Sequence, residues 1–229
     1  RVNVSVRREG WDDLLEFEIV RDKIEVPSVP NAFMLTPETA YVKISRFSRH
    51  TNRELQDALK KLRHSGFRRL ILDLRENGGG YLEQAVEVAD QFIERGRLLV
   101  YTEGRFSNSR EDHFAEEDPS IGPDVPILVL VNSYSASASE IVAGAIQDYD
   151  RGLVIGHTTF GKGLVQKQYH LKNGGAVLLT VARYFTPSDR PIQRPFSEDH
   201  DSYVEEARDD YDPNADPDSV AAKPIYYTR

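Results

Sequence analysis

Apolar residues recur along the chain with two spacings, one typical of strands and one typical of helices. The alternation within Val2 to Val6 and within Leu15 to Ile19 predicts an antiparallel hairpin. A second hairpin is expected from Leu164 to Tyr184, where Asn173 and Gly174 provide the turn. Short apolar runs predict further strands, some of them buried, at 40–47, 70–74, 98–101, 127–131 and 153–155.

Helical spacing separates several of these strands. A first helix is expected to begin at a capping box formed by Thr51 and Glu54. Two more are expected at Leu82 to Ile93 and at Ala138 to Tyr149. Strands that alternate with helices predict an α/β fold, with a mostly parallel central sheet flanked by helices and antiparallel β-rich segments near the ends.

Composition narrows the choice of function. The chain has 229 residues and a net charge of −8, which argues against nucleic acid as a partner. The acid is concentrated between Glu198 and Asp218, where ten Asp or Glu residues face one basic residue, as in a solvated loop. Cysteine is absent, which excludes disulfides, thiolate metal sites and cysteine nucleophiles. The histidines lack metal-ligand spacing, so no metal and no cofactor are expected.

The stretch GHTTFGKG, from Gly156 to Gly163, nearly matches a phosphate-binding loop. Gly163 stands where the pattern requires a hydroxyl that binds magnesium. Such a loop also needs a following helix, whereas Leu164 to Leu171 predicts a strand. Both departures argue against a nucleotide-binding domain, which is kept as a rival hypothesis.

Ser137 stands between a central strand and the start of a helix. In α/β sheets, functional sites collect at the carboxyl ends of strands. A helix start also offers the free backbone N–H groups that stabilise an oxyanion. However, Ser137 and Glu140 also form a capping box, and capping is a common reason for a serine at this position. Both interpretations of Ser137 are open at this point.

A nucleophilic serine requires a base, and two candidates follow Ser137. His157 is the nearest downstream histidine, although no G-x-S-x-G elbow surrounds Ser137. Lys162 can serve instead if burial lowers its pKa from ~10.4 toward neutrality. Its flanking glycines would allow close backbone packing and bring the amine inward. The alternative is an exposed turn lysine, which is the usual state of lysine.

A third segment, Leu72 to Gly80, ends a strand with three successive glycines. Turns of this kind expose backbone N–H groups to a ligand, although a plain connecting loop is an equally good interpretation.

Together these segments resemble the C-terminal processing peptidases, also called tail-specific proteases. The matching motifs occur in the family's order: Leu72-Asp-Leu-Arg-x-Asn-x-Gly-Gly80, Ser135-Ala-Ser-Ala-Ser-Glu140 with Gly144 and Asp148, and Thr159-Phe-Gly-Lys-Gly163 with Gln166. Ser137 and Lys162 lie 25 positions apart, as in the family. The resemblance covers roughly residues 35–195.

The resemblance implies a serine endopeptidase that cleaves proteins near their C-terminus through an acyl-enzyme. Ser137 would be the nucleophile, Lys162 its buried, neutral general base, and Gln166 the residue that orients Lys162. A non-catalytic peptide-binding or ligand-binding module of the same fold is the alternative.

The oxyanion hole implied by the resemblance consists of backbone N–H groups. One would come from Ala138 and the other from a glycine, with Gly80 preferred to Gly79. Asp148 matches an acidic position of the family without an assigned role, and His157 replaces an acidic residue that is common there.

The resemblance also implies a ClpP/crotonase-like core in a truncated chain that lacks most of a PDZ domain. Residues 1–34 would be the PDZ end and a connecting β segment, 35–195 the catalytic core, and 196–229 an acidic loop and the start of a C-terminal segment. The expected substrates are proteins or peptides with accessible C-terminal tails, with a membrane or lipoprotein adaptor as a candidate partner. The expected location is the bacterial periplasm or cell envelope.

Overall fold

The computed structural model describes residues 1–22, 26–106 and 108–195 of the chain. The acidic stretch 198–218 lies outside these described residues. In chain order the elements are β1 (Val2–Val6), β2 (Leu15–Ile19), β3 (Asn31–Thr36), β4 (Thr39–Lys43), α1 (Thr51–His64), β5 (Arg69–Asp73), α2 (Leu82–Asp90), β6 (Leu98–Gly104), β7 (Glu111–Phe114), β8 (Ile127–Val131), α3 (Ala138–Asp148), β9 (Leu153–Gly156), β10 (Leu164–His170) and β11 (Ala176–Phe185).

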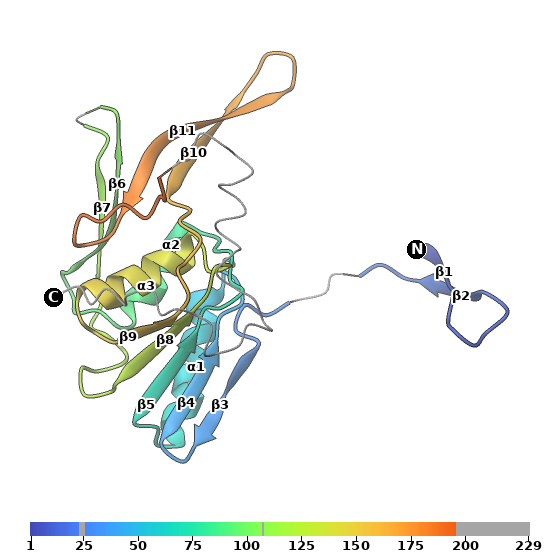
Figure 1. Ribbon diagram of the computed structural model, residues 1–229, viewed down its shortest axis with the longest axis horizontal. Helices are drawn as coiled ribbons and strands as arrows, with labels where there is room; N and C mark the ends of the chain where they lie inside the picture. The colour runs from blue at the N-terminus through green and yellow to red at the C-terminus, as the bar shows by residue number, and fades with distance from the viewer. Residues whose placement is uncertain (23–25, 107, 196–229) are drawn as a thin grey trace, which may run out of the picture.

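A five-stranded sheet in the order β3-β4-β5-β8-β9 forms the centre of the molecule (Figure 1). β3 pairs antiparallel with β4, and every other pair is parallel, which confirms the predicted mostly parallel sheet. Successive side chains of a strand point to opposite faces, and one face is fully buried at Val42, Leu72 and Val129.

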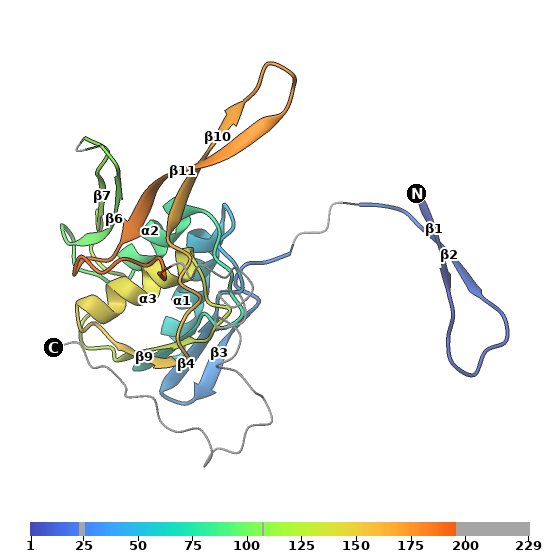
Figure 2. The ribbon, with the colours of Figure 1, turned by 45° about the horizontal axis from the view of Figure 1, so that its top comes forward.

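All three helices cover this same face of the central sheet (Figure 2). The crossovers advance in one direction along the sheet, and right-handed crossovers then place every helix on one side. α1 buries Leu55, Leu59 and Leu62 at helical spacing. On the opposite face Leu128 and Leu130 stay partly exposed, so the expected flanking helices lie on one side only among the described residues.

A second, antiparallel sheet in the order β10-β11-β6-β7 lies beyond α2 and α3 (Figure 1). The predicted second hairpin is confirmed by the pairing of β10 with β11. The sequence predicts antiparallel segments only near the ends of the chain. β6 departs from this prediction, because it comes from the middle of the chain and pairs antiparallel with β11 and β7.

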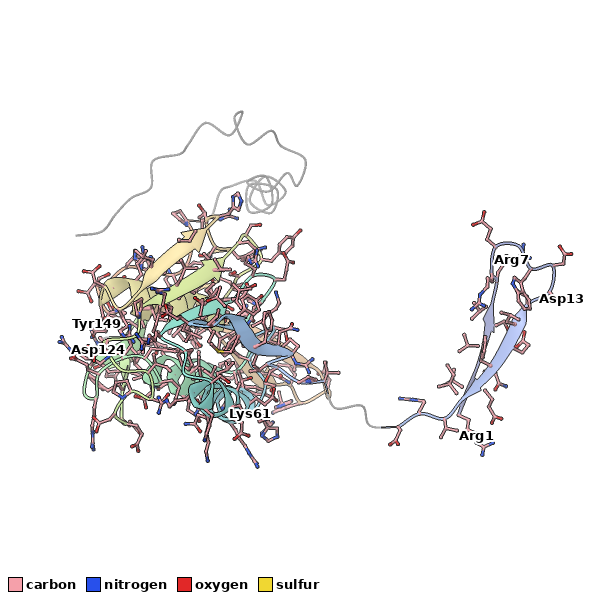
Figure 3. All side chains as sticks on the ribbon, turned by 90° about the horizontal axis from the view of Figure 1, so that it is seen from below. Arg1, Arg7, Asp13, Lys61, Asp124 and Tyr149 are labelled. Atoms are coloured by element: carbon pink, nitrogen blue, oxygen red, sulfur yellow. The ribbon has the colours of Figure 1, made fainter. Side chains whose placement is uncertain are left out.

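The start of the chain contains the predicted first hairpin, in which Val4 of β1 pairs with Phe17 of β2. In Figure 3 the hairpin, with the labelled Arg7 and Asp13, stands apart from the larger sheets. β3 then enters the central sheet, so the boundary expected between residues 34 and 35 falls within this strand. None of the helices in the described part of the chain has the length and apolar character needed to cross a membrane.

The capping box predicted for α1 is wrong. Helix α1 begins at Thr51 with His50 as its N-cap residue, and no side-chain hydrogen bond caps it. The Glu54 carboxylate instead accepts the N–H groups of Ser28 and Val29, at 2.7 and 2.9 Å. Glu54 therefore connects the segment before β3 to α1 through two hydrogen bonds.

Residues 186–194, which follow β11, are anchored to the end of α3 by Asp148. Its carboxylate accepts hydrogen bonds from the Ser188 N–H at 3.0 Å, the Ser188 hydroxyl at 2.7 Å and the Arg190 guanidinium at 2.7 Å. Burial raises the pKa of Asp148, but hydrogen bonds from Thr186, Ser188 and Arg190 outweigh burial and hold this pKa below its usual value. Asp148 thus acquires a structural role that the sequence did not reveal.

Replacing Asp148→Asn removes the charge that Arg190 faces, so we expect the free energy of unfolding at pH 7 to fall by about 1–3 kcal/mol. The pKa of Asp148 is lowered in the folded state. Its stabilising effect is therefore present above the unfolded pKa of about 3.9 and is lost as pH falls through the folded value. Urea unfolding at several pH values from 7 down to 3 should show the difference between variant and wild type shrinking at the acidic end.

The matched control is Asp57→Asn on the exposed side of α1, which should change stability by less than about 0.5 kcal/mol. A loss for Asp148→Asn that is equally large at every pH would show that the charge of Asp148 does not stabilise the fold.

Candidate active site

Three loops meet at the carboxyl end of the central sheet. They are residues 74–81 after β5, 132–137 after β8 and 157–163 after β9. Because these three strands are parallel, the loops that follow them emerge at one edge of the sheet. The three motifs singled out in the sequence are therefore brought together.

The buried side chain of Asn77 organises the glycine turn. Its Nδ2 donates to the Ile44 carbonyl at 2.8 Å, and its Oδ1 accepts the Gly79 N–H at 2.9 Å. The Asn77 carbonyl accepts the Ala136 N–H at 3.0 Å and the Ser139 hydroxyl at 2.9 Å. One residue thus connects the turn after β5 to the start of α3.

Ser137 is the N-cap residue of α3 and has φ 57° and ψ −111°. A residue other than glycine rarely adopts a positive φ, and strain of about 1–3 kcal/mol at such a position is typical of functional sites. Ser137 follows a strand and begins a helix, which is the arrangement of a nucleophile elbow. The sequence lacks the G-x-S-x-G pattern, so the strained conformation could not be predicted from it.

Gly79 packs directly against Ser137. It has φ +95°, and a Cβ atom added to it would lie 2.7 Å from the Ala136 carbonyl oxygen and 2.8 Å from the Ser137 Cβ. Gly80 forms a parallel bridge with Phe47, in which the Phe47 N–H donates to the Gly79 carbonyl at 2.9 Å. Neither position leaves room for a side chain, so the glycine backbone can approach the serine closely.

The backbone N–H groups around Ser137 differ in their partners. The Gly79 N–H is occupied by Asn77. The N–H groups of Gly80 and Ala138 donate no hydrogen bond within residues 1–22, 26–106 and 108–195. These two groups therefore remain available to a ligand beside the serine.

Lys162 is exposed, so the prediction of a buried side chain is wrong for this structure. The close packing that its glycine neighbours permit is real, but it buries backbone instead of the amine. The Gly161 carbonyl accepts the Arg194 N–H at 3.0 Å, and the Gly163 N–H donates to Gln193 Oε1 at 3.0 Å.

The other predicted positions in this region are exposed as well. Gln166 lies in β10, and both Gln166 and His157 are exposed. A strand, β10, follows the loop 157–163, where a phosphate-binding loop would require a helix. Among the described residues, no group of three or more His, Asp or Glu side chains is arranged to hold a metal ion.

Glu140 connects the segment 132–137, which ends at Ser137, to the loop 157–163, called the lysine loop below. Its carboxylate accepts the N–H groups of Ser137 and Gly161, both at 2.7 Å, and of Lys162 at 2.9 Å. Burial raises the pKa of Glu140, and a hydrogen bond from Thr159 together with these N–H groups opposes the effect of burial. The capping bond to Ser137 was predicted, whereas no pattern in the sequence indicates the bonds to the lysine loop.

The chain matches the sequence profile of Peptidase family S41 over residues 38–201. It is 40% identical over 196 residues to a carboxy-terminal-processing protease of Bartonella bacilliformis, an alignment that covers 84% of this chain and 44% of the relative. A probable CtpA-like serine protease of Staphylococcus aureus is 36% identical over 191 residues, which cover 83% of this chain and 38% of the relative.

A solved structure, the photosystem II D1 C-terminal processing protease, superposes with a TM-score of 0.66 and 33% identity, covering 79% of this chain and 49% of that one. The chain thus spans half or less of the length of these proteins. Since the family profile matches well over half of the sequence, the chain belongs to peptidase family S41.

Proposed function

We propose that this chain carries the catalytic core of a serine endopeptidase that cleaves proteins near their C-terminus. The observation that carries the proposal is the strained Ser137 at the start of α3, packed against Gly79. The N–H groups of Gly80 and Ala138 lie on the two segments that meet there. The relatives named as processing proteases support the same reaction.

In the proposed reaction, Ser137 Oγ attacks the carbonyl carbon of the scissile peptide bond, and Lys162 Nζ takes the hydroxyl proton. The N–H groups of Ala138 and Gly80 stabilise the oxyanion, and Gly79 is the second choice because Asn77 occupies its N–H. Collapse of the tetrahedral intermediate breaks the C–N bond, and Lys162 returns the proton to the leaving amine. Water then hydrolyses the ester and restores Ser137.

This reaction needs a neutral lysine amine, and Lys162 is exposed in the structure. A peptide substrate lying over the loop would exclude water, and exclusion of water favours the neutral form of an amine. Gln166 is proposed to orient that amine once it is covered. The proposal thus makes covering of Lys162 a step before catalysis.

The setting of the site is proposed on the same basis. The core would be ClpP/crotonase-like, preceded by the end of a PDZ domain within residues 1–34. The substrates would be proteins or peptides with accessible C-terminal tails, and a membrane or lipoprotein adaptor would be a partner. The bacterial relatives are consistent with a periplasmic or envelope location, which cell fractionation would test.

A peptide-binding module without catalysis is the second candidate, and the exposure of Lys162 and Gln166 favours it. A fluorophosphonate probe separates the two, because an activated serine attacks its phosphorus and displaces fluoride to form a phosphonate ester, whereas a binding module stays unmodified.

Ser137→Ala should abolish cleavage of an unfolded protein with an apolar C-terminal tail, and Lys162→Ala should slow it by about 10²–10⁴-fold. The exposed Lys172, at the tip of the β10–β11 hairpin, provides the control Lys172→Ala, which should cleave at the wild-type rate. Gel electrophoresis with initial rates measures all four proteins. Cleavage that survives both active-site substitutions would refute the Ser–Lys mechanism.

Gly79→Ala should lower kcat/KM by about 100-fold or more, the effect of disturbing an oxyanion site. The new Cβ would lie 2.8 Å from the Ser137 Cβ and would need a φ of +95°, which L-residues rarely adopt. Gly78→Ala is the matched control, since no atom lies within 4 Å of its added Cβ. Equal rates for the two variants, with both shown to be folded by thermal melting, would exclude the glycine turn from the site.

A further inference from the structure

The carboxylate of Glu140 holds the backbone on both sides of the proposed site. Oε2 accepts the Ser137 N–H at 2.7 Å and the Lys162 N–H at 2.9 Å, while Oε1 accepts the Gly161 N–H at 2.7 Å. Only 6% of the residue is exposed. One buried side chain therefore bonds directly to the main chain of both residues that carry the proposed chemistry.

Helix capping accounts for only part of this arrangement. A glutamate at the third helical position normally bonds back to the N-cap N–H, as Glu140 does to Ser137. The bonds to Gly161 and Lys162 reach a loop that follows another strand. They contribute nothing to the cap, so they require a separate explanation.

The lysine loop depends on contacts of this kind because it belongs to no helix or strand. Residues 157–163 lie between β9 and β10. The Phe160 N–H donates to the Ser135 carbonyl at 3.0 Å. Gly161 bonds to Arg194, and Gly163 bonds to Gln193. Glu140 adds hydrogen bonds to the N–H groups of Gly161 and of Lys162 itself. Glu140 lies in α3, the helix that begins at Ser137.

A serine and its base must come within about 3 Å to exchange a proton. A displacement of 1 Å in such a pair can cost about 100-fold in rate. A strained residue such as Ser137 also keeps its conformation only where its surroundings fix it. Glu140 bonds to the main chain of both Ser137 and Lys162, so one side chain can fix the backbone of the strained serine and of its proposed base.

We propose that Glu140 is a positioning residue, whose carboxylate sets the separation of Ser137 and Lys162 and holds Ser137 in its strained conformation. The inference rests on the proposed Ser–Lys function and adds to it a residue that does not touch the substrate. Glu140 acts through the backbone of the two reacting residues.

Glutamine is the informative substitution because it keeps the shape and removes one acceptor. Both carboxylate oxygens accept hydrogen bonds, whereas the amide nitrogen of glutamine only donates. Whichever way the amide is oriented, its NH₂ group faces either the Gly161 N–H or the N–H groups of Ser137 and Lys162. At least one contact to the lysine loop is lost in each orientation.

The control is Glu54→Gln, since Glu54 also accepts two backbone N–H groups, from Ser28 and Val29, but on α1. For wild type, Glu140→Gln and Glu54→Gln, the rate of Ser137 phosphonylation by a fluorophosphonate would be measured at increasing reagent concentrations. Hydrogen exchange of residues 159–163 and thermal melting would be followed in the same samples.

We expect Glu140→Gln to remain folded, to exchange faster at 159–163, and to lower the limiting phosphonylation rate by about tenfold or more. The reagent concentration for half the limiting rate should change little, because a positioning defect acts on the reacting complex. Glu54→Gln should be phosphonylated at the wild-type rate. A purely structural Glu140 would instead leave the limiting rate of the folded variant unchanged, and that result would overturn the inference.

Unaltered exchange at 159–163 in Glu140→Gln would also overturn the inference, because the loop would then be held by other contacts. Failure of the underlying function gives a different result. If the wild-type chain does not react at Ser137, the proposed nucleophile is wrong, and the role of Glu140 falls with it.

Discussion

The parallel pairing of β4, β5, β8 and β9 is the constraint on which the other features depend. Parallel neighbours need a crossover, and crossovers of one hand that advance in one direction place all three helices on one face. The same pairing brings the loops after β5, β8 and β9 to one edge. The sheet thus determines both where the core lies and where a site can form.

Loops at that edge cannot satisfy their backbone groups by regular pairing, and buried side chains take over this task. The Asn77 side chain bonds to Ile44 before α1, while its main-chain carbonyl accepts the Ser139 hydroxyl of α3. The Glu140 side chain bonds to the start of α3 and to the lysine loop. Buried polar groups need such partners, because an unmatched one costs about 1–3 kcal/mol. Asn77 and Glu140 thus link the three irregular segments to one another.

Helix α3 carries a carboxylate near each end, one bonded to the lysine loop and the other to the segment that leads to residues 193 and 194. Glu140 bonds to it directly, whereas Asp148 holds residues 186–190, whose continuation at 193 and 194 bonds to the flanking glycines. A negative charge is favourable at the start of a helix and unfavourable at its end. Asp148 is stabilised in the unfavourable position by Arg190 and Ser188.

Much of this could be read from the sequence, and the failures have identifiable causes. Periodicity predicted the parallel sheet, both hairpins and α3, since each depends on local apolar spacing. The glycines beside Lys162 led to the prediction of a buried side chain, because adjacent glycines indicate close packing. They do not indicate which side of the backbone is packed. The φ of Ser137 and the bonds from Glu140 to the lysine loop depend on tertiary contacts, which leave no mark on spacing. The proposed catalytic roles of Ser137, Lys162 and Gln166 stay predictions.

The order of the three loops along the chain has a consequence for biosynthesis. A ribosome releases the chain from its N-terminus, so Ser137 emerges before Lys162, and Lys162 before Gln193 and Arg194. Because the lysine loop bonds to both Glu140 and these later residues, its full set of contacts cannot form until all of them have left the ribosome. A growing chain therefore lacks the contacts between the lysine loop and residues 193 and 194 until those residues have emerged.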